Sequence, residues 1–164
     1  SREKLLPLAA RLGSDVAFFL AEENSAWCLG RGERFSDVVL PSLAVLVVKP
    51  KKAKINTGWA YRALDRERAG EARSWALDSK MPEYFRGNFS IPNLENDFEA
   101  LALKASPELQ GLKAGLAKSG ALTGQMSGSG SCFFGIYRDS GDRERGRLFF
   151  KKAGFEAFPC EIAA

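Results

Sequence analysis

The sequence predicts an α+β fold: a ferredoxin-like α/β sandwich preceded by a shorter segment from a second domain. Three observations support this prediction. From residue 43 onward, apolar runs and helix signals follow the order strand, helices, strand, strand, helix, strand, as in a split β-α-β unit. The chain before that point does not fit the unit, so we place a domain remnant at residues 1–40 and the second domain at 41–164. The 164 residues, 45% of them hydrophobic, can bury one substantial core.

The first segment begins with a predicted helix. Apolar residues recur at helical spacing between residues 5 and 12, Gly13 follows as a stop, and Pro7 is expected to kink or delay the helix. Asp15 then precedes an apolar run. A lone aspartate in this position is usually a turn or cap residue. The alternative is a carboxylate held at the mouth of the core, where it can accept a proton.

The next elements are predicted strands. Residues 26–29 and 33–39 flank a Gly-Arg-Gly tripeptide and indicate a hairpin. Residues 43–48 are the most continuous β-branched run and predict a central strand. A basic loop follows at 49–54, and we interpret it as solvated surface, with steering of an anionic substrate as the alternative.

Helices follow the central strand. Thr57 is expected to cap the first and Asn96 the second. Ser106-Pro107 starts the third, with Pro107 at its first helical position. Residues 65–93 are charged and poorly periodic, so they predict no element. Toward the C-terminus the pattern indicates a strand, a glycine-rich loop, an apolar strand at 132–137, a helix at 142–153 and a last strand at 156–162.

The glycine-rich loop alternates serine with glycine over residues 127–131. Gly128 and Gly130 remove Cβ crowding, permit positive φ and let the backbone approach a ligand closely, and the serine hydroxyls project from the same turn. A phosphate-sized anion could therefore bind here. The alternative is a flexible linker, but a linker would not lead straight into an apolar strand. The loop matches neither the Walker nor the dinucleotide-binding pattern.

Composition excludes several kinds of chemistry. The chain has no histidine, which removes Ser-His-Asp and Cys-His mechanisms and most transition-metal sites. Cys28, Cys132 and Cys160 are far apart, so we expect reduced, buried thiols in an intracellular protein and neither a disulfide framework nor a zinc site. No run approaches the roughly 20 apolar residues of a membrane span. The net charge of +4 fits either a nucleic-acid binder or a protein that handles polyphosphates.

With these elements in place, the chain resembles the C-terminal part of the GHMP small-molecule kinases over almost its whole length. The motifs that carry the resemblance are Ala9 to Leu20, Gly30-Arg31-Gly32-Glu33, Ile55-Asn56-Thr57 with Tyr61-Arg62-Ala63-Leu64, Asn96-Asp97-Phe98-Glu99 and Met126 to Cys132. Each motif is weak alone, and five in this order at family-like spacing are a strong signal. The stretch from residue 57 to 64 indicates the branch of the family that acts on a cytidine diphosphate derivative.

The resemblance implies a GHMP-kinase-like fold and an ATP-dependent phosphorylation in the non-mevalonate isoprenoid pathway. The acceptor would be a hydroxyl of the methylerythritol moiety of a cytidine diphosphate derivative. By carry-over, Asp15 is the general base, and the loop residues Gly128, Ser129, Gly130 and Ser131 close over the phosphates. Such chemistry depends on positioning and charge neutralisation. Magnesium would arrive with ATP, and no protein metal site is expected.

The resemblance also assigns the acceptor site. Tyr61 matches a position where the family places an aromatic ring against cytosine, and Thr57 lies one helical turn away. The alternative is that Tyr61 is a core residue beside Leu64. Where the family usually has Gly-Ala-Asp-Val-Pro, this chain has Gly-Ser-Asp-Val-Ala at residues 13–17. The aspartate is kept, but the replacement of proline by Ala17 removes a restraint on φ close to it.

The family's first nucleotide loop, and the lysine that works with the aspartate, match nothing in the 164 residues. We therefore expect a cytoplasmic partial enzyme, inactive alone, whose partner is the missing N-terminal portion of the same enzyme. The oligomeric state is not readable from the sequence. Two alternatives remain: a homoserine or mevalonate kinase of the same family, and a ferredoxin-like RNA-binding module. The RNA-binding alternative is weaker, because Phe133, Phe134 and Tyr137 fall on both faces of one strand, so we expect no nucleic-acid partner. We also expect no association with a membrane.

Overall fold

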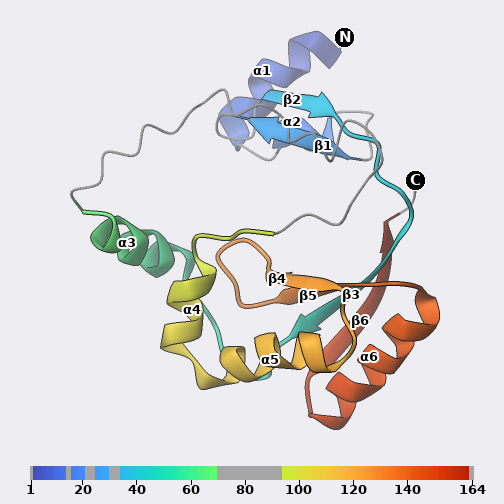
Figure 1. Ribbon diagram of the computed structural model, residues 1–164. Coiled ribbons are helices and arrows are strands. Elements are labelled where there is room, and N and C mark those ends of the chain that lie inside the picture. Colours follow the sequence, from blue (N-terminus) through green and yellow to red (C-terminus); the bar gives the residue numbers. More distant parts are fainter. Residues whose placement is uncertain (1, 14–15, 21–24, 30–33, 70–93, 163–164) are drawn as a thin grey trace. The chain divides into compact units, whose positions relative to one another are not determined.

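The computed structural model describes residues 2–13, 16–20, 25–29, 34–69 and 94–162. These residues form two units, coloured along the chain in Figure 1. The first unit takes its described residues from 2–41, and the second from 42–69 and 94–162.

The first unit contains two helices and a hairpin: α1 (Arg2–Leu12), α2 (Val16–Phe19), β1 (Ala26–Leu29) and β2 (Arg34–Asp37). Strands β1 and β2 are antiparallel, with Ala26 opposite Asp37, which confirms the predicted hairpin. The glycine-containing turn between them lies outside the described residues. Pro7 stands inside α1 and does not delay it, because the helix begins five residues earlier at Arg2. The leucines at positions 5, 8 and 12 are exposed, whereas Ala9 is buried.

The second unit is the predicted ferredoxin-like sandwich. Its strands are β3 (Leu43–Lys49), β4 (Thr123–Met126), β5 (Phe133–Tyr137) and β6 (Glu156–Ile162), in the sheet order β4-β5-β3-β6. All neighbouring strands are antiparallel. Helices α3 (Thr57–Glu67), α4 (Glu99–Ala105) and α5 (Pro107–Lys118) connect β3 to β4, and α6 (Ser140–Lys152) connects β5 to β6. Strand β3 lies inside the sheet, as its β-branched sequence predicts.

One face of the sheet forms the core with α5 and α6, which lie along the same side in Figure 1. Alternate residues of the strands point to this side, since successive side chains of a strand project to opposite faces. The core therefore joins Leu46 and Val48 of β3 to Phe133 and Tyr137 of β5, together with Phe150 of α6. This burial leaves Phe133 and Tyr137 unavailable for stacking on RNA bases.

The helix caps agree with the sequence at some positions and differ at others. Helix α5 starts at Pro107, as predicted, and the side chain of Ser106 caps it by accepting the N–H of Leu109. The prediction that Thr57 caps α3 was wrong by one residue, because the side chain of Asn56 accepts the N–H of Trp59 at 2.9 Å. Asn96 was also wrongly assigned as a cap, since α4 starts at Glu99 and the residue before it makes no side-chain cap bond.

The cysteines are free, as expected, but they are not buried. Cys28 and Cys160 are exposed and Cys132 is partly exposed. The prediction of buried thiols failed because a strand-like context does not say which face of the strand is covered. Among the described residues, no helix has the length and apolar character needed to cross a membrane.

Candidate functional site

The glycine-rich loop is the hairpin connection between β4 and β5. The N–H of Ser127 donates to the carbonyl of Cys132 at 2.9 Å, which closes the loop. Inside it, the N–H of Gly130 donates to the carbonyl of Ser127 at 3.0 Å. Gly128 has a φ of 54° and Gly130 a φ of 96°, so both need the left-handed region that glycine tolerates. The glycines of the sequence motif are therefore required by the turn.

The loop has donors with no protein partner. In the described part of the chain, the backbone N–H groups of Gly128, Ser129 and Ser131 donate to no other group. Successive free N–H groups in a glycine-containing turn attract anions, and the hydroxyls of the same loop add further donors. The arrangement can therefore bind an anion with several oxygens, such as a phosphate.

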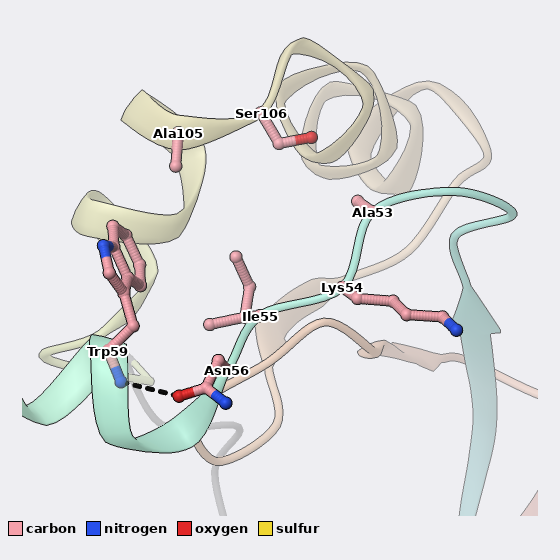
Figure 2. A pocket seen from close by; sticks show the side chains of 7 residues that line it. All are labelled: Ala53, Lys54, Ile55, Asn56, Trp59, Ala105 and Ser106. Carbon is pink, nitrogen blue, oxygen red and sulfur yellow. Dashed lines mark hydrogen bonds between the residues drawn. The ribbon is translucent and has the colours of Figure 1, made fainter.

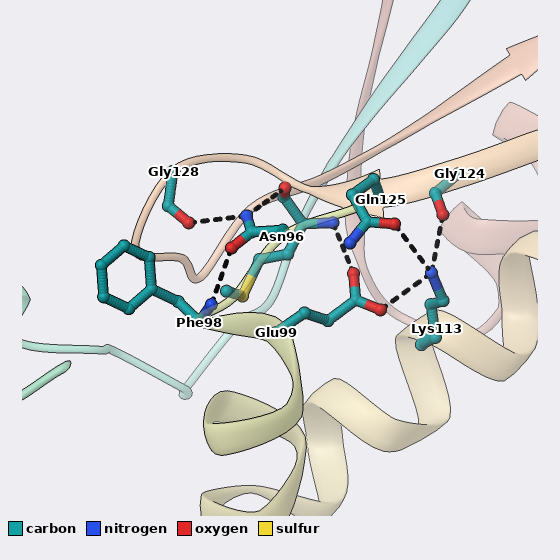
Figure 3. A network of polar contacts seen from close by, with 8 residues as sticks. Asn96, Phe98, Glu99, Lys113, Gly124, Gln125 and Gly128 are labelled. Atoms are coloured by element: carbon teal, nitrogen blue, oxygen red, sulfur yellow. Dashed lines mark hydrogen bonds and ion pairs between the residues drawn. The ribbon is translucent and has the colours of Figure 1, made fainter. Parts of the chain in front are cut away.

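The side chain of Asn96 is hydrogen-bonded to the start of this loop. Its amide nitrogen donates to the carbonyl of Met126 and to the carbonyl of Gly128, both at 2.8 Å (Figure 3). Its side-chain oxygen accepts the N–H of Phe98 at 2.9 Å. The whole amide is thus used, and the loop is joined to the chain that leads into α4.

A second set of contacts continues along β4. The carboxylate of Glu99 accepts the N–H of Met126 at 2.8 Å and lies 2.9 Å from the ammonium of Lys113, which donates to the carbonyl of Gly124 at 2.7 Å (Figure 3). Strand β4 is at the edge of its sheet, so its outward backbone groups have no neighbouring strand. Side chains from α4 and α5 satisfy these groups, which anchors the strand that carries the loop.

The first turns of α3 approach the loop. The hydroxyls of Thr57 and Ser129 are hydrogen-bonded at 2.9 Å. Tyr61, one turn further along, is 56% exposed, so the alternative of a core residue is wrong. Its ring packs against that of Phe98 in an edge-to-face arrangement, with 4.9 Å between the ring centroids. The start of α3 and the glycine-rich loop, which lie about 70 positions apart in the sequence, therefore meet here.

A pocket of about 420 Å³ lies between the start of α3 and the junction of α4 and α5 (Figure 2). It is lined by Ala53, Lys54, Ile55, Asn56, Trp59, Ala105 and Ser106. Trp59 is two positions from Thr57 and from Tyr61, so the three side chains do not share a helix face. Another lining residue, Ile55, lies close to the loop, since a Cβ built at Gly130 would be 3.4 Å from its side chain.

Another pocket, of about 330 Å³, borders the loop at Ser127 and Cys132. Its other lining residues come from the strands: Val45, Val47, Phe133, Phe134, Ile136 and Ile162. The lining carries no charged side chain, so it offers nothing to neutralise a phosphate. The anion-binding groups remain those of the loop.

Asp15, the predicted base, lies outside the described residues. The described residues contain no group of three or more His, Cys, Asp or Glu side chains that could hold a metal ion. The sequence prediction missed Asn96 as a contact of the loop, and Glu99 and Lys113 as contacts of strand β4. Asn96 and Glu99 begin and end the Asn-Asp-Phe-Glu motif, so the sequence did draw attention to them. From the local pattern, however, the asparagine was interpreted only as a helix cap.

Comparison with known proteins gives consistent results. The family model described as GHMP kinases C terminal matches residues 86–156. The chain is 32% identical over 160 residues to a 4-diphosphocytidyl-2-C-methyl-D-erythritol kinase of Desulfitobacterium hafniense, covering 96% of this chain and 54% of the relative. The Anaeromyxobacter dehalogenans kinase of the same name is 38% identical over 142 residues, covering 85% and 44%.

A solved structure is similar as well. The crystal structure of a 4-(cytidine 5'-diphospho)-2C-methyl-D-erythritol kinase superposes with a TM-score of 0.75 at 28% sequence identity. The match covers 98% of this chain and 57% of the solved one. The chain thus spans about half the length of the curated relatives it matches.

Proposed function

We propose that the chain is part of a GHMP kinase and takes part in the ATP-dependent phosphorylation of 4-diphosphocytidyl-2-C-methyl-D-erythritol on a methylerythritol hydroxyl. Residues 41–164 are the C-terminal domain of the kinase and residues 1–40 the end of the N-terminal domain. The remaining N-terminal portion of the enzyme is the partner that supplies the first nucleotide loop. We place the enzyme in the cytoplasm, which the free cysteines support.

One observation carries the proposal: an anion-binding loop lies within hydrogen-bonding distance of the helix assigned to the acceptor. The free N–H groups of Gly128, Ser129 and Ser131 suit phosphate oxygens. Thr57, on the adjacent helix, is bonded to the hydroxyl of Ser129. A phosphoryl donor and its acceptor must approach closely and in line, and the contact between loop and helix supports that arrangement.

In the proposed reaction the acceptor hydroxyl oxygen attacks the γ-phosphorus of ATP. The bond from that phosphorus to the bridging oxygen breaks, and ADP leaves with the electron pair. Asp15 takes the proton of the hydroxyl. Magnesium would arrive with ATP and would neutralise charge on its phosphates. The loop N–H groups and hydroxyls stabilise the charge on the transferred phosphoryl group.

Tyr61 is proposed to stack on the cytosine of the acceptor. Its exposure leaves the ring accessible, and the edge-to-face contact with Phe98 supports the ring in one orientation. Base stacking on such a ring is tolerant of sequence and favours a nucleotide-bearing substrate.

The test is a comparison of acceptors with the full-length protein. ADP release should be measured with the cytidine diphosphate substrate, homoserine and mevalonate under the same conditions. We expect turnover in the ordinary kinase range of about 1 to 100 per second with the cytidine substrate alone. Equal or faster turnover with homoserine or mevalonate would overturn the assignment of the acceptor and leave a different GHMP kinase.

A further inference from the structure

Asn96 controls the direction of two peptide groups in the glycine loop. The carbonyls of Met126 and Gly128 both accept hydrogen bonds from its amide nitrogen, at 2.8 Å each. In a trans peptide the carbonyl and the following N–H point to opposite sides of the chain. A bond to the carbonyl of residue 126 or 128 therefore also sets the direction of the N–H of residue 127 or 129.

The first of these peptides shows the effect within the structure. The carbonyl of Met126 is held by Asn96, and on the opposite side the N–H of Ser127 donates to Cys132 at 2.9 Å. The second peptide follows the same geometry. Because Asn96 holds the carbonyl of Gly128, the N–H of Ser129 points away from Asn96, and in the described chain it has no partner.

We propose that Asn96 is a positioning residue that aims the N–H of Ser129 at the phosphate of the nucleotide. This inference rests on the proposed function of the loop as a phosphate site. The glycine at position 128, with its φ of 54°, imposes little steric barrier to rotation of the 128–129 peptide. A rotated peptide would turn the carbonyl of Gly128 toward the anion, where two negative groups repel. The side chain of Asn96 opposes that rotation.

The orientation of the Asn96 amide is itself determined by its partners. Its oxygen accepts the N–H of Phe98, and its nitrogen faces the two carbonyls, so each end has the chemistry that its neighbours require. Replacing Asn96 by aspartate keeps the shape and the acceptor for Phe98. It also puts a carboxylate oxygen where two carbonyls need a donor, which favours rotation of the peptide.

The variants are therefore Asn96→Asp and, as a second one without the added charge, Asn96→Ala, both in the full-length protein. The matched control is Ser106→Ala, which removes a hydrogen-bonding cap from α5 and leaves the loop contacts intact. We expect ATP to bind Asn96→Asp about 10- to 100-fold more weakly, as for the loss of a hydrogen bond to a charged group. The KM for the cytidine substrate should stay close to wild type, and Ser106→Ala should bind ATP normally.

Nuclear magnetic resonance separates the outcomes. Without nucleotide, the carbonyl resonance of Gly128 should move in both Asn96 variants and not in Ser106→Ala. With ATP, the amides of Gly128, Ser129 and Ser131 should move in the wild type. If these amide resonances do not shift when ATP is added, the proposed function of the loop fails and the inference fails with it. If they respond, and both Asn96 variants bind ATP as tightly as wild type, the role of Asn96 is overturned while the phosphate loop stands.

Discussion

At the scale of single residues, Tyr61 tests the assignment of the acceptor. Tyr61 is 56% exposed and makes an edge-to-face contact with Phe98, so truncation to alanine should change the melting temperature little. If the ring stacks on cytosine, Tyr61→Ala should raise the KM for the cytidine substrate by an amount equivalent to about 1 to 3 kcal/mol. The KM for ATP should not change, and Tyr61→Phe should be nearly silent. Equal effects on the two substrates would count against stacking.

Asp15 carries the second prediction at this scale. The change Asp15→Asn keeps the shape of the side chain and removes the proton acceptor. In the full-length protein we expect kcat to fall by about 10²- to 10⁴-fold, the usual contribution of a general base, with an unchanged melting temperature. Steady-state kinetics on the purified variant provide the measurement. A near-normal kcat would show that Asp15 is only a turn residue, as its local sequence alone suggests.

At the scale of helices, two glycines in helix interiors predict effects of opposite sign. A Cβ at Gly146 of α6 would lie 2.5 Å from the hydroxyl of Tyr137, a fully buried side chain. A Cβ at Gly111 of α5 would meet nothing within 4 Å. We expect Gly146→Ala to destabilise the protein by about 1 to 3 kcal/mol through overpacking. We expect Gly111→Ala to stabilise the protein by about 0.5 to 1 kcal/mol, because alanine lowers the backbone entropy of the unfolded chain.

Urea denaturation of the two variants at neutral pH measures both changes. Because the substitutions are chemically identical, helix propensity favours alanine in each case, and only the surroundings differ. A Gly146→Ala protein as stable as wild type would mean that α6 does not pack on Tyr137 as closely as the structure shows.

Glu108, near the start of α5, links stability to pH. Its desolvation raises the pKa of the carboxyl, but hydrogen bonds from the backbone N–H groups of Ala53, Lys51 and Lys52 and the charge of Lys52 outweigh this, so the pKa is lowered from 4.5. A lowered pKa in the folded state favours folding once the carboxyl is ionised. The contribution is complete above pH 4.5 and is lost as the pH falls through the folded-state pKa.

The test compares wild type with Glu108→Gln by urea denaturation between neutral pH and about pH 3. The wild type should lose more stability than the variant over the acidic part of this range, since the glutamine cannot be protonated. Identical pH profiles would show that the carboxylate does not anchor the loop at residues 51–53.

At the scale of the whole molecule, local pattern was enough to predict the second unit. The last strand at 156–162, the buried run after the glycine loop and the Ser106-Pro107 helix start all agree with the structure. These features depend on side-chain alternation and capping, which act over a few residues. The sheet order follows from the same elements, because the order of strands and helices leaves few compact arrangements.

What the sequence did not predict depends on contacts between distant segments. Asn96 has a local role that looks like a cap, and its bonds to Met126 and Gly128 appear only when the hairpin folds back beside it. Lys113 similarly reads as an exposed residue of an amphipathic helix until the edge of β4 lies next to it. No periodicity encodes which side chain satisfies an unpaired strand edge. Candidate contacts of the loop therefore required the structure.

The activity of the 164-residue chain alone is the last prediction. The loop and the acceptor helix meet in the second unit, so the chain should retain weak binding of ATP, measurable by titration calorimetry. Phosphoryl transfer also requires groups that neutralise the phosphates from other directions, and the family's first nucleotide loop and its lysine match nothing in this sequence. We therefore expect no ADP release with the cytidine substrate from this chain, and release from the full-length protein under identical conditions. Turnover by the 164 residues at about 1 to 100 per second would show that this chain already contains every group the reaction needs.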